Sequence, residues 1–261
     1  MPSLSFIGTG SGFPSAERFF SSTLVHLGSI HLLVDAGEPC VHLLRDRGNM
    51  IGEIDAILIT HGHVDHIGGI PAFLQGAMLI ERKKPLAIHL PREMISPLKA
   101  WIAALYLTEI GLGFSVSWIP WNPDAPALLE GGVSITSHAN KHLVDCYRVL
   151  PGADPSKECQ SYSLDIKAGN FRTLFSGDLA SASELLSLVV NPATVLVSEL
   201  SHVTIEELVS VLAEADLGTL CLVHLSEDMV GDRSELQGRM EELLPAIKDV
   251  IVPEDGTILD F

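Results

Sequence analysis

The segment Thr60–Gly69 constrains the fold more than any other part of the chain. It follows the β-branched run Ile54–Thr60, which is typical of a buried strand. Four metal-ligand side chains stand within six residues directly after that strand: His61, His63, Asp65 and His66. Imidazole and carboxylate groups suit zinc and similar divalent ions. We therefore interpret the segment as a metal-binding loop at a strand end. The alternative, a solvated polar turn, would leave these groups uncompensated.

Strand and helix patterns continue along the chain in two β-rich stretches, each followed by helices. This order predicts an α/β fold of layered sheets with helices outside. Without a long linker, we expect one domain over residues 1–261. Hydrophobic periodicity predicts strands at 4–7, 23–27, 30–34, 54–60, 86–90, 133–137, 144–150, 161–167, 171–175, 194–200, 220–225 and 250–252, and helices at 38–47, 69–80, 92–110, 205–215 and 235–247.

The formal net charge is −17, with 16 basic against 33 acidic residues. Because Lys and Arg supply most of the affinity for a phosphate backbone, this balance argues against an extended nucleic-acid interface. A nucleotide substrate would have to be held locally, for example by bound cations, which are often the largest charges in a site. The composition therefore disfavours an extended nucleic-acid partner.

Location and redox state are predicted from the termini and the cysteines. The chain opens without a basic segment followed by a long apolar run, and the apolar region 94–114 is interrupted by Pro97, Lys99 and Glu109, so we expect neither a signal peptide nor a membrane span. The cysteines Cys40, Cys146, Cys159 and Cys221 lie far apart without a CxxC pair. We expect reduced thiols and a cytoplasmic protein.

The pattern His-x-His-x-Asp-His before Gly-Gly resembles the signature of the metallo-β-lactamase superfamily. The resemblance implies a four-layer αββα sandwich with two metals at one edge, and further ligands after later strands. The turn Ser176-Gly177-Asp178 resembles the family's bridging carboxylate, and Leu222-Val223-His224-Leu225-Ser226 resembles the segment of its last ligand. The middle ligand is His142 or His138, and we prefer His142 because 142–148 resembles a ribonuclease Z segment.

This resemblance assigns every ligand of a dinuclear centre. It implies that His61, His63 and His142 hold one metal, that Asp65, His66 and His224 hold the second, and that Asp178 bridges them. Two such ions would lower the pKa of a bridging water and give hydroxide near neutral pH, with Asp65 both a ligand and a catalytic residue. Zinc is the expected ion, and manganese and iron use similar ligands.

Two further features resemble the ribonuclease Z branch. One is the opening Phe6–Pro14, whose alternative is an ordinary glycine-rich hairpin. The other is Ser198-Glu199-Leu200-Ser201-His202. In that branch such a histidine, oriented by a glutamate, is thought to protonate the leaving oxygen, which implies these roles for His202 and Glu199. The alternative for His202 is that it merely begins a helix.

The chain also departs from ribonuclease Z. Only 29 residues lie between Arg148 and Asp178, too few for the arm that clamps tRNA. We therefore expect a phosphodiesterase acting on a small cyclic phosphodiester, a nucleotide or an RNA end, with Arg18, Lys141 and Arg148 as candidate phosphate contacts. The alternatives are an ester, thioester or lactone hydrolase, a tRNA 3′-processing endonuclease, and a non-catalytic metal-binding member. Related enzymes suggest a homodimer.

Overall fold

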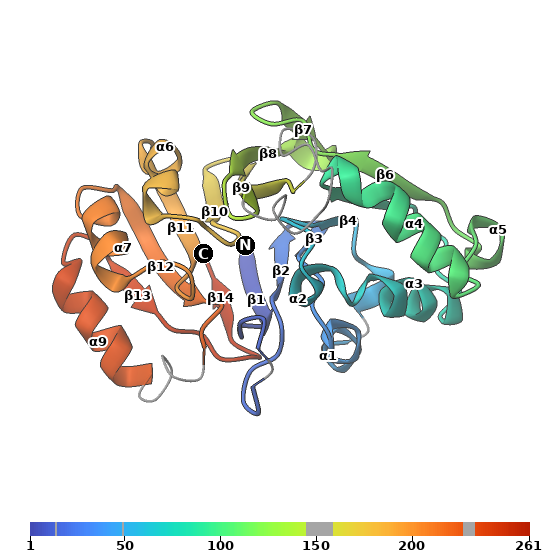
Figure 1. The fold of residues 1–261 in the computed structure, drawn as a ribbon, viewed down its shortest axis with the longest axis horizontal. Coiled ribbons are helices and arrows are strands. Elements are labelled where there is room, and N and C mark those ends of the chain that lie inside the picture. The colour runs from blue at the N-terminus through green and yellow to red at the C-terminus, as the bar shows by residue number, and fades with distance from the viewer. Residues whose placement is uncertain (14, 49, 145–158, 227–232) are drawn as a thin grey trace.

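The computed structural model describes residues 1–13, 15–48, 50–144, 159–226 and 233–261. Two seven-stranded mixed sheets pack against each other, and helices cover the outer face of each sheet (Figure 1). This arrangement confirms the predicted α/β sandwich with helices outside. The described strands are β1 Ser3–Gly8, β2 Ser22–Leu27, β3 Ile30–Val34, β4 Ala56–Leu58, β5 Leu86–Leu90, β6 Val116–Pro120, β7 Pro126–Leu128, β8 Val133–Asn140, β9 Ser161–Ala168, β10 Phe171–Phe175, β11 Ala193–Glu199, β12 Leu217–Val223, β13 Asp249–Ile251 and β14 Ile258–Asp260.

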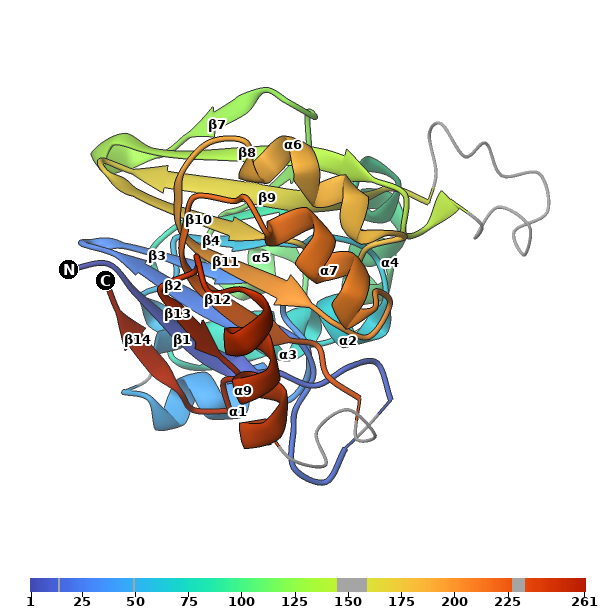
Figure 2. The same ribbon diagram turned by 90° about the vertical axis from the view of Figure 1, so that its left-hand side faces the viewer.

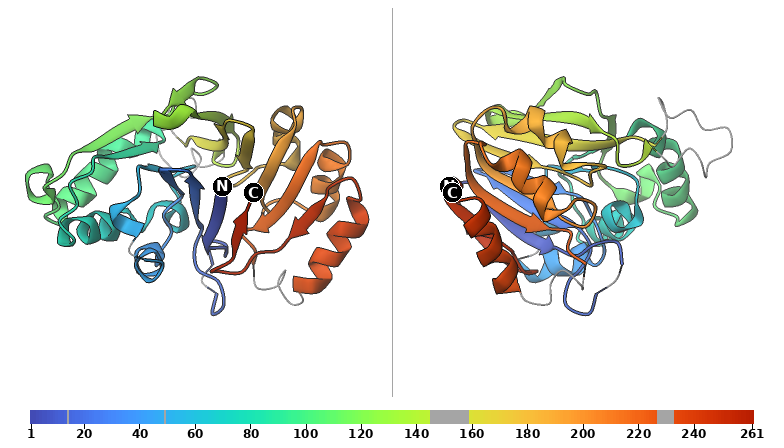
Figure 3. Two further views of the ribbon diagram at one scale, coloured as in Figure 1. Left: turned by 180° about the vertical axis from the view of Figure 1, so that it is seen from behind. Right: turned by 60° about the vertical axis from the view of Figure 1, so that its left-hand side comes forward.

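The first sheet has the strand order β14-β1-β2-β3-β4-β5-β6. Its β14, β1, β2 and β3 pair antiparallel, and β3 to β6 pair parallel. Gly28 takes a positive φ in the tight turn between β2 and β3, as the Gly-Ser dipeptide predicts. Figure 3 shows β1 and β14 side by side, with the two chain termini close together.

The second sheet has the order β13-β12-β11-β10-β9-β8-β7, with β10 to β13 parallel and β7 to β10 antiparallel. Figure 2 shows its helices, α6, α7 and α9, lying over β10 to β13. Together with short 3₁₀ turns, the described helices are α1 Cys40–Asp46, α2 Val64–Ile67, α3 Ile70–Leu79, α4 Ile95–Ala104, α5 Glu109–Leu112, α6 Leu186–Val189, α7 Ile205–Leu212 and α9 Arg233–Leu243.

Three apolar clusters hold these layers together. One lies between the sheets and includes Phe6, Val34 and Tyr162, and the other two join each sheet to its helices. Strands buried on both faces have nearly continuous apolar sequences, which is why β4 and β11 are recognisable from sequence. A rigid sandwich of this kind leaves its strand-end loops to carry polar side chains.

Several predicted elements differ from the structure. The helix expected over 92–110 is broken, because Tyr106 takes a positive φ and Thr108 caps the new helix α5. The strands β6, β7 and β14 were not predicted; each lies at or near a sheet edge and is short, and β6 and β7 contain proline, which edge positions tolerate. The strand expected at 144–150 lies, apart from Val144, outside the described residues.

The described helices are also relevant to the expectation that no membrane span exists. Within the described parts of the chain, no helix combines the length and the apolar character that crossing a bilayer requires.

Candidate metal centre

The seven predicted ligand side chains meet at one end of the sandwich. His61 and His63 follow β4, Asp65 and His66 lie on or beside α2, and the others follow strands β8, β10 and β12. Parallel strands deliver their carboxyl ends to one sheet edge, which brings the loops together. Three overlapping groups have ligand atoms within 4.8 Å of one another: His61, His63, His142 and Asp178; Asp65, His66 and His224; and Asp178, His202 and His224.

Asp178 lies between the first two groups. Its Oδ2 is 3.7 Å from His61 Nε2, 3.5 Å from His142 Nε2 and 3.5 Å from His224 Nε2. Its Oδ1 is 3.4 Å from His66 Nε2. A carboxylate in this place reaches both groups, which is what the bridging role expected of it requires.

The structure brings His142 to this cluster rather than His138. His142 Nε2 lies 3.3 Å from His63 Nδ1. His138 lies on β8, and its Nδ1 hydrogen-bonds Asp124 Oδ1 at 2.8 Å. The geometry therefore favours His142, the residue that we preferred from the sequence, over His138.

The buried atoms of the cluster fit a divalent ion. His61 is completely buried, yet its Nε2 has no hydrogen-bond partner among the described residues. Buried polar atoms without a partner are rare in native structures and call for an explanation such as a bound ion. Imidazole nitrogens and carboxylate oxygens around this atom form a donor set suited to zinc, manganese or iron.

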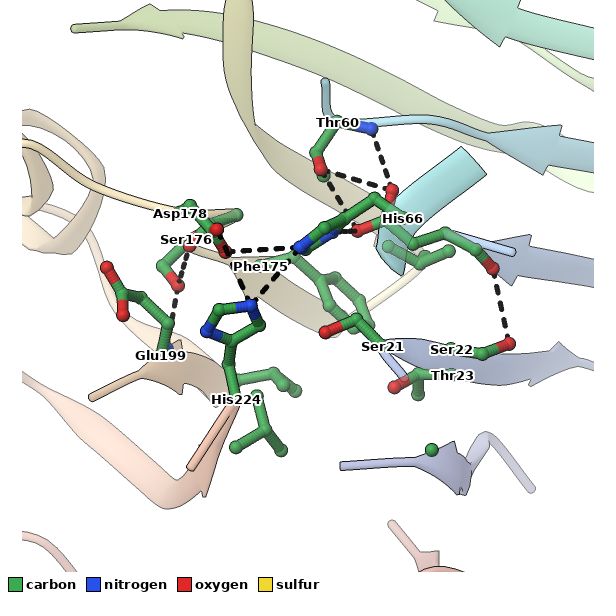
Figure 4. Close-up of a pocket in the computed structure, with 16 residues that line it drawn as sticks. Ser21, Ser22, Thr23, Thr60, His66, Phe175, Ser176, Asp178, Glu199 and His224 are labelled. Carbon is green, nitrogen blue, oxygen red and sulfur yellow. Dashed lines mark hydrogen bonds and ion pairs between the residues drawn. The ribbon is translucent and has the colours of Figure 1, made fainter. Parts of the chain in front are cut away.

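Hydrogen bonds outside the cluster fix its side chains. Asp35 Oδ2 accepts from His66 Nδ1 at 2.8 Å, and Asp35 Oδ1 accepts from Thr60 N at 2.8 Å. Thr60 Oγ1 lies 3.1 Å from His61 Nδ1. Such partners orient ligand histidines and leave the opposite nitrogen for the metal. Figure 4 shows His66, His224 and Asp178 turned toward one another, and all three line a small cavity together with Ser21, Ser22 and Thr23.

Burial and charge set the protonation of this cluster. Burial alone would raise the pKa of Asp178, but the charges of His66 and His224 hold it well below its usual value. Burial lowers the pKa of His61 far below its usual value. Burial also works against a charged His66, but Asp178 and Asp35 raise the pKa of His66 well above its usual value. Without a metal, His66 therefore retains a proton that an ion would have to displace.

Metal binding is therefore expected to stabilise the fold, and to do so less in acid. An ion at 100 times its dissociation constant adds about 2.7 kcal/mol to the unfolding free energy, because it binds only the folded chain. Because the pKa of His66 is raised, protons compete with the ion increasingly as the pH falls. We expect calorimetry to show a zinc-dependent rise in Tm that is larger at about pH 8 than at about pH 6. These two pH values lie on either side of the ordinary histidine pKa. A rise independent of pH would contradict this.

Glu199 and His202 form a second arrangement beside the cluster. The buried Glu199 carboxylate accepts hydrogen bonds from Leu179 N at 2.9 Å, Ser201 N at 2.8 Å and His202 N at 2.9 Å. Its Oε2 is also 3.1 Å from His202 Nδ1, and that nitrogen lies 3.8 Å from Asp178 Oδ2. The Glu199 hydrogen bond raises the pKa of His202. A fixed carboxylate thus holds a half-exposed imidazole at the edge of the centre.

The glycine turn that follows β1 also reaches the centre. A Cβ on Gly12 would lie 3.1 Å from Asp65 Oδ2, so the turn packs directly on that carboxylate. Arg18, expected to contact phosphate, is instead buried and donates to Thr9 Oγ1 and Pro253 O. Its guanidinium is used within the fold, so this prediction was wrong. Lys141 is exposed beside His142, and Arg148 lies outside the described residues.

The sequence did not identify several supporting residues. Thr60 joins Asp35 to His61, and Ser176 Oγ accepts from Glu199 N at 2.9 Å. Both residues are close to predicted site residues in the sequence, and this proximity was the one indication that they support the site. Their partners, however, are set by strand pairing that only the structure defines.

Comparison with known proteins supports the fold and the family. The family model described as "Anti-Pycsar protein Apyc1" matches residues 2–243. A ribonuclease Z of an Exiguobacterium species is 33% identical over 115 residues, covering 44% of this chain and 37% of that enzyme. A ribonuclease Z of Metallosphaera sedula is 26% identical and covers 98% of both chains.

A solved structure agrees with these sequence matches. The metallo-β-lactamase fold protein YhfI of Bacillus subtilis has a TM-score of 0.79 with 21% identity, covering 99% of this chain and 98% of that one. The fold and the resemblance expected from the histidine motif are thereby confirmed. The chain belongs to the family of the Anti-Pycsar protein Apyc1, within the ribonuclease Z-like hydrolases of the metallo-β-lactamase fold.

Proposed function

We propose that the chain is a dinuclear metal-dependent phosphodiesterase that cleaves a small phosphodiester, a nucleotide or an RNA end. The observation that carries this proposal is the Glu199–His202 pair at the edge of the cluster, 3.8 Å from Asp178. A histidine held by a buried carboxylate is suited to protonate the oxygen of a poor leaving group, such as an alkoxide. Hydrolysis of a lactone or thioester has no such feature to support it here.

The residues divide the work in this proposal. His61, His63 and His142 would hold one ion, Asp65, His66 and His224 would hold the other, and Asp178 would be shared by the two. When bound, two ions supply a water nucleophile near neutral pH and stabilise the attacking and leaving oxygens. Asp65 keeps its negative charge, because hydrogen bonds from His224 and His66 outweigh the effect of burial and lower its pKa. Glu199 orients His202, whose Nε2 remains to protonate the leaving oxygen.

Charge supports a small substrate. With a net charge of −17, the chain offers little attraction to a long phosphate backbone beyond the metal centre. The chain matches 37% or 55% of the length of two curated ribonuclease Z relatives but 98% of the one from Metallosphaera sedula, so the preference for a small substrate rests on charge rather than on length. A cyclic nucleotide or a short nucleotide therefore fits better than a folded tRNA.

Exposed apolar side chains beside the centre support a substrate with a base. Phe13 follows the glycine that packs on Asp65, and it is 79% exposed. Val64, between His63 and Asp65, is 68% exposed. Stacking of a base on an aromatic ring contributes about 1–3 kcal/mol. We propose Phe13 as a surface for the nucleobase.

Substitution of Phe13 tests this point. Phe13→Ala is expected to raise KM for thymidine 5′-p-nitrophenyl phosphate by roughly five- to 150-fold, the equivalent of the stacking energy, and to leave kcat nearly unchanged. Methyl p-nitrophenyl phosphate has no base and is expected to show no change in KM. Phe171→Leu, on β10 away from the centre, serves as an apolar control. An equal loss on both substrates would contradict a role in base binding.

The remaining properties follow from the same proposal. We propose zinc as the native ion, with manganese or iron as substitutes. We also propose a cytoplasmic location, since Cys40 and Cys221 are buried free thiols among the described residues. We also propose a homodimer. Two large apolar side chains, Trp101 on α4 and Leu105 directly after it, are each 45% exposed and support this proposal. Light scattering of the purified chain, which measures its mass in solution, tests it.

A substrate panel tests the function itself. Purified protein loaded with zinc or manganese is assayed on bis(p-nitrophenyl) phosphate, on purine and pyrimidine cyclic nucleotides, on a tRNA precursor, on a thioester and on a lactone. The proposal expects turnover of the phosphodiesters and little turnover of the tRNA precursor. Exclusive cleavage of the thioester or the lactone would overturn the phosphodiesterase assignment while leaving the metal centre intact.

A further inference from the structure

The glycine turn, defined here as residues 8–13 together with 15–22, lies against the half of the cluster that contains Asp65 and His224. Thr9 O accepts a hydrogen bond from Leu225 N, the residue after His224. Gly12 packs so closely on Asp65 that a Cβ added to this glycine would lie only 3.1 Å from Asp65 Oδ2. A shift of this turn would therefore displace Asp65 and His224, two residues of one proposed metal site.

The turn is attached to the C-terminal segment 253–257. Asp255 Oδ1 accepts from Thr9 N at 2.8 Å and from Thr9 Oγ1 at 2.7 Å, and Asp255 Oδ2 accepts from Phe19 N at 2.5 Å. Arg18 Nη1 donates to Thr9 Oγ1 at 2.6 Å and to Pro253 O at 2.8 Å. One carboxylate thus holds both ends of the turn, and a buried guanidinium holds the same hydroxyl.

We propose that Asp255 is a positioning residue for the metal centre, acting through Thr9 to hold the glycine turn against Asp65 and the His224 strand end. The segment is itself fixed to β1, because Gly256 N donates to Phe6 O and Phe6 N donates to Thr257 O. The rigid first sheet therefore transmits its position to the centre. Asp255 lies beyond the stretch 2–243 that the family model matches.

Two substitutions of Thr9 separate the role of its hydroxyl group from the role of its volume. Thr9 is completely buried, so Thr9→Val keeps its volume but removes the hydroxyl between Asp255 and Arg18. Thr9→Ser keeps the hydroxyl and loses only a methyl group. A role in positioning predicts that the serine variant resembles the wild type and that the valine variant does not.

Zinc release is the principal measurement. The zinc-loaded protein is mixed with a chromophoric chelator, and the release of each ion is followed in time. Thr9→Val is expected to release one of two ions roughly 10-fold faster, the lower end of the effect of losing a group that hydrogen-bonds a ligand directly, because Thr9 acts through the turn. Thr9→Ser is expected to stay within about twofold of the wild type. Asp255→Asn is expected to have a smaller effect in the same direction, because its amide oxygen still accepts from Thr9. Glu254→Gln, in the same C-terminal segment 253–257 but exposed and paired with Arg233, is the control.

A second readout does not require the metal. Amide hydrogen exchange of the metal-free protein is expected to quicken in residues 8–13 and 15–22 of Thr9→Val, and not in the far sheet. Equal release rates in all four variants, or equal acceleration by Thr9→Ser and Thr9→Val, would overturn the proposal. The role of the residue rests on the proposed metal centre, yet zinc release and exchange give the same answer whichever bond the enzyme cleaves, so a failed phosphodiesterase assay would leave this test intact.

Discussion

Asp178→Asn is expected to abolish phosphodiester turnover while leaving the fold in place. The change keeps the shape of the side chain and removes the charge that reaches four predicted ligand histidines, whose nearest nitrogens lie 3.4–3.7 Å away. An amide cannot bridge two cations as a carboxylate does. We expect kcat/KM to fall roughly 10⁴-fold or more, equivalent to about 5.4 kcal/mol of lost transition-state stabilisation, and bound zinc to fall below two ions per chain.

A matched control separates this effect from general damage. Asp124→Asn removes another carboxylate that hydrogen-bonds a histidine, His138, away from the cluster. It is expected to retain wild-type activity and zinc content. The measurements are initial rates, metal content by mass spectrometry and Tm by calorimetry. An Asp178→Asn enzyme that keeps both ions and more than about a tenth of its activity would contradict the bridging role.

His202→Ala is expected to lower activity by an amount that depends on the leaving group. A cyclic nucleotide releases an alkoxide, which needs a proton, and the loss there should be roughly 10²- to 10⁴-fold in kcat. Thymidine 5′-p-nitrophenyl phosphate releases a stable phenolate, and the loss there should be less than about tenfold, because little protonation is needed. Zinc content should not change, since the metal ligands remain.

The Glu199–His202 pair can be tested in the same assay. Glu199→Gln leaves His202 in place but removes the charge that raises the pKa of His202. The alkaline limb of the kcat/KM profile with a cyclic nucleotide should therefore move to lower pH, because the imidazole loses its proton sooner. His138→Ala, a half-exposed histidine with a different carboxylate partner, is the control. An equal loss on both leaving groups, or an unmoved alkaline limb, would contradict the general-acid assignment.

Much of the site could be predicted because its residues stand in short motifs at strand ends. His61, His63, Asp65 and His66 follow a buried strand directly, and Asp178 and His224 each follow another strand, so strand order alone brings them near each other. The choice between His142 and His138 was open in the sequence. It depends on where β8 ends, and β8 runs on to Asn140, which keeps His138 within the strand and lets His142 reach the centre.

Other features depended on contacts that a linear pattern does not contain. Arg18 was expected to contact a phosphate, but its guanidinium donates a hydrogen bond to Pro253 O, 235 positions away in the sequence. Asp255 meets Thr9 across 246 positions. The helix predicted over 92–110 was wrong because local hydrophobic periodicity continues through Leu105–Thr108, where the backbone turns at Tyr106. Strands β6, β7 and β14 are short edge elements, and their existence depends on a partner strand rather than on their own sequence.

The dinuclear phosphodiesterase centre is tested most sharply by titrating the metal-free protein with manganese. The rate of cyclic-nucleotide hydrolysis and the number of ions bound per chain are measured together. Six predicted ligand side chains surround Asp178 in two sets, and each set has a histidine nitrogen close to this one carboxylate. A dinuclear centre predicts that turnover saturates only when two ions are bound, and that electron paramagnetic resonance then detects magnetic coupling between them. Full activity with a single ion bound, or a fully loaded protein that leaves every phosphodiester intact, would contradict it.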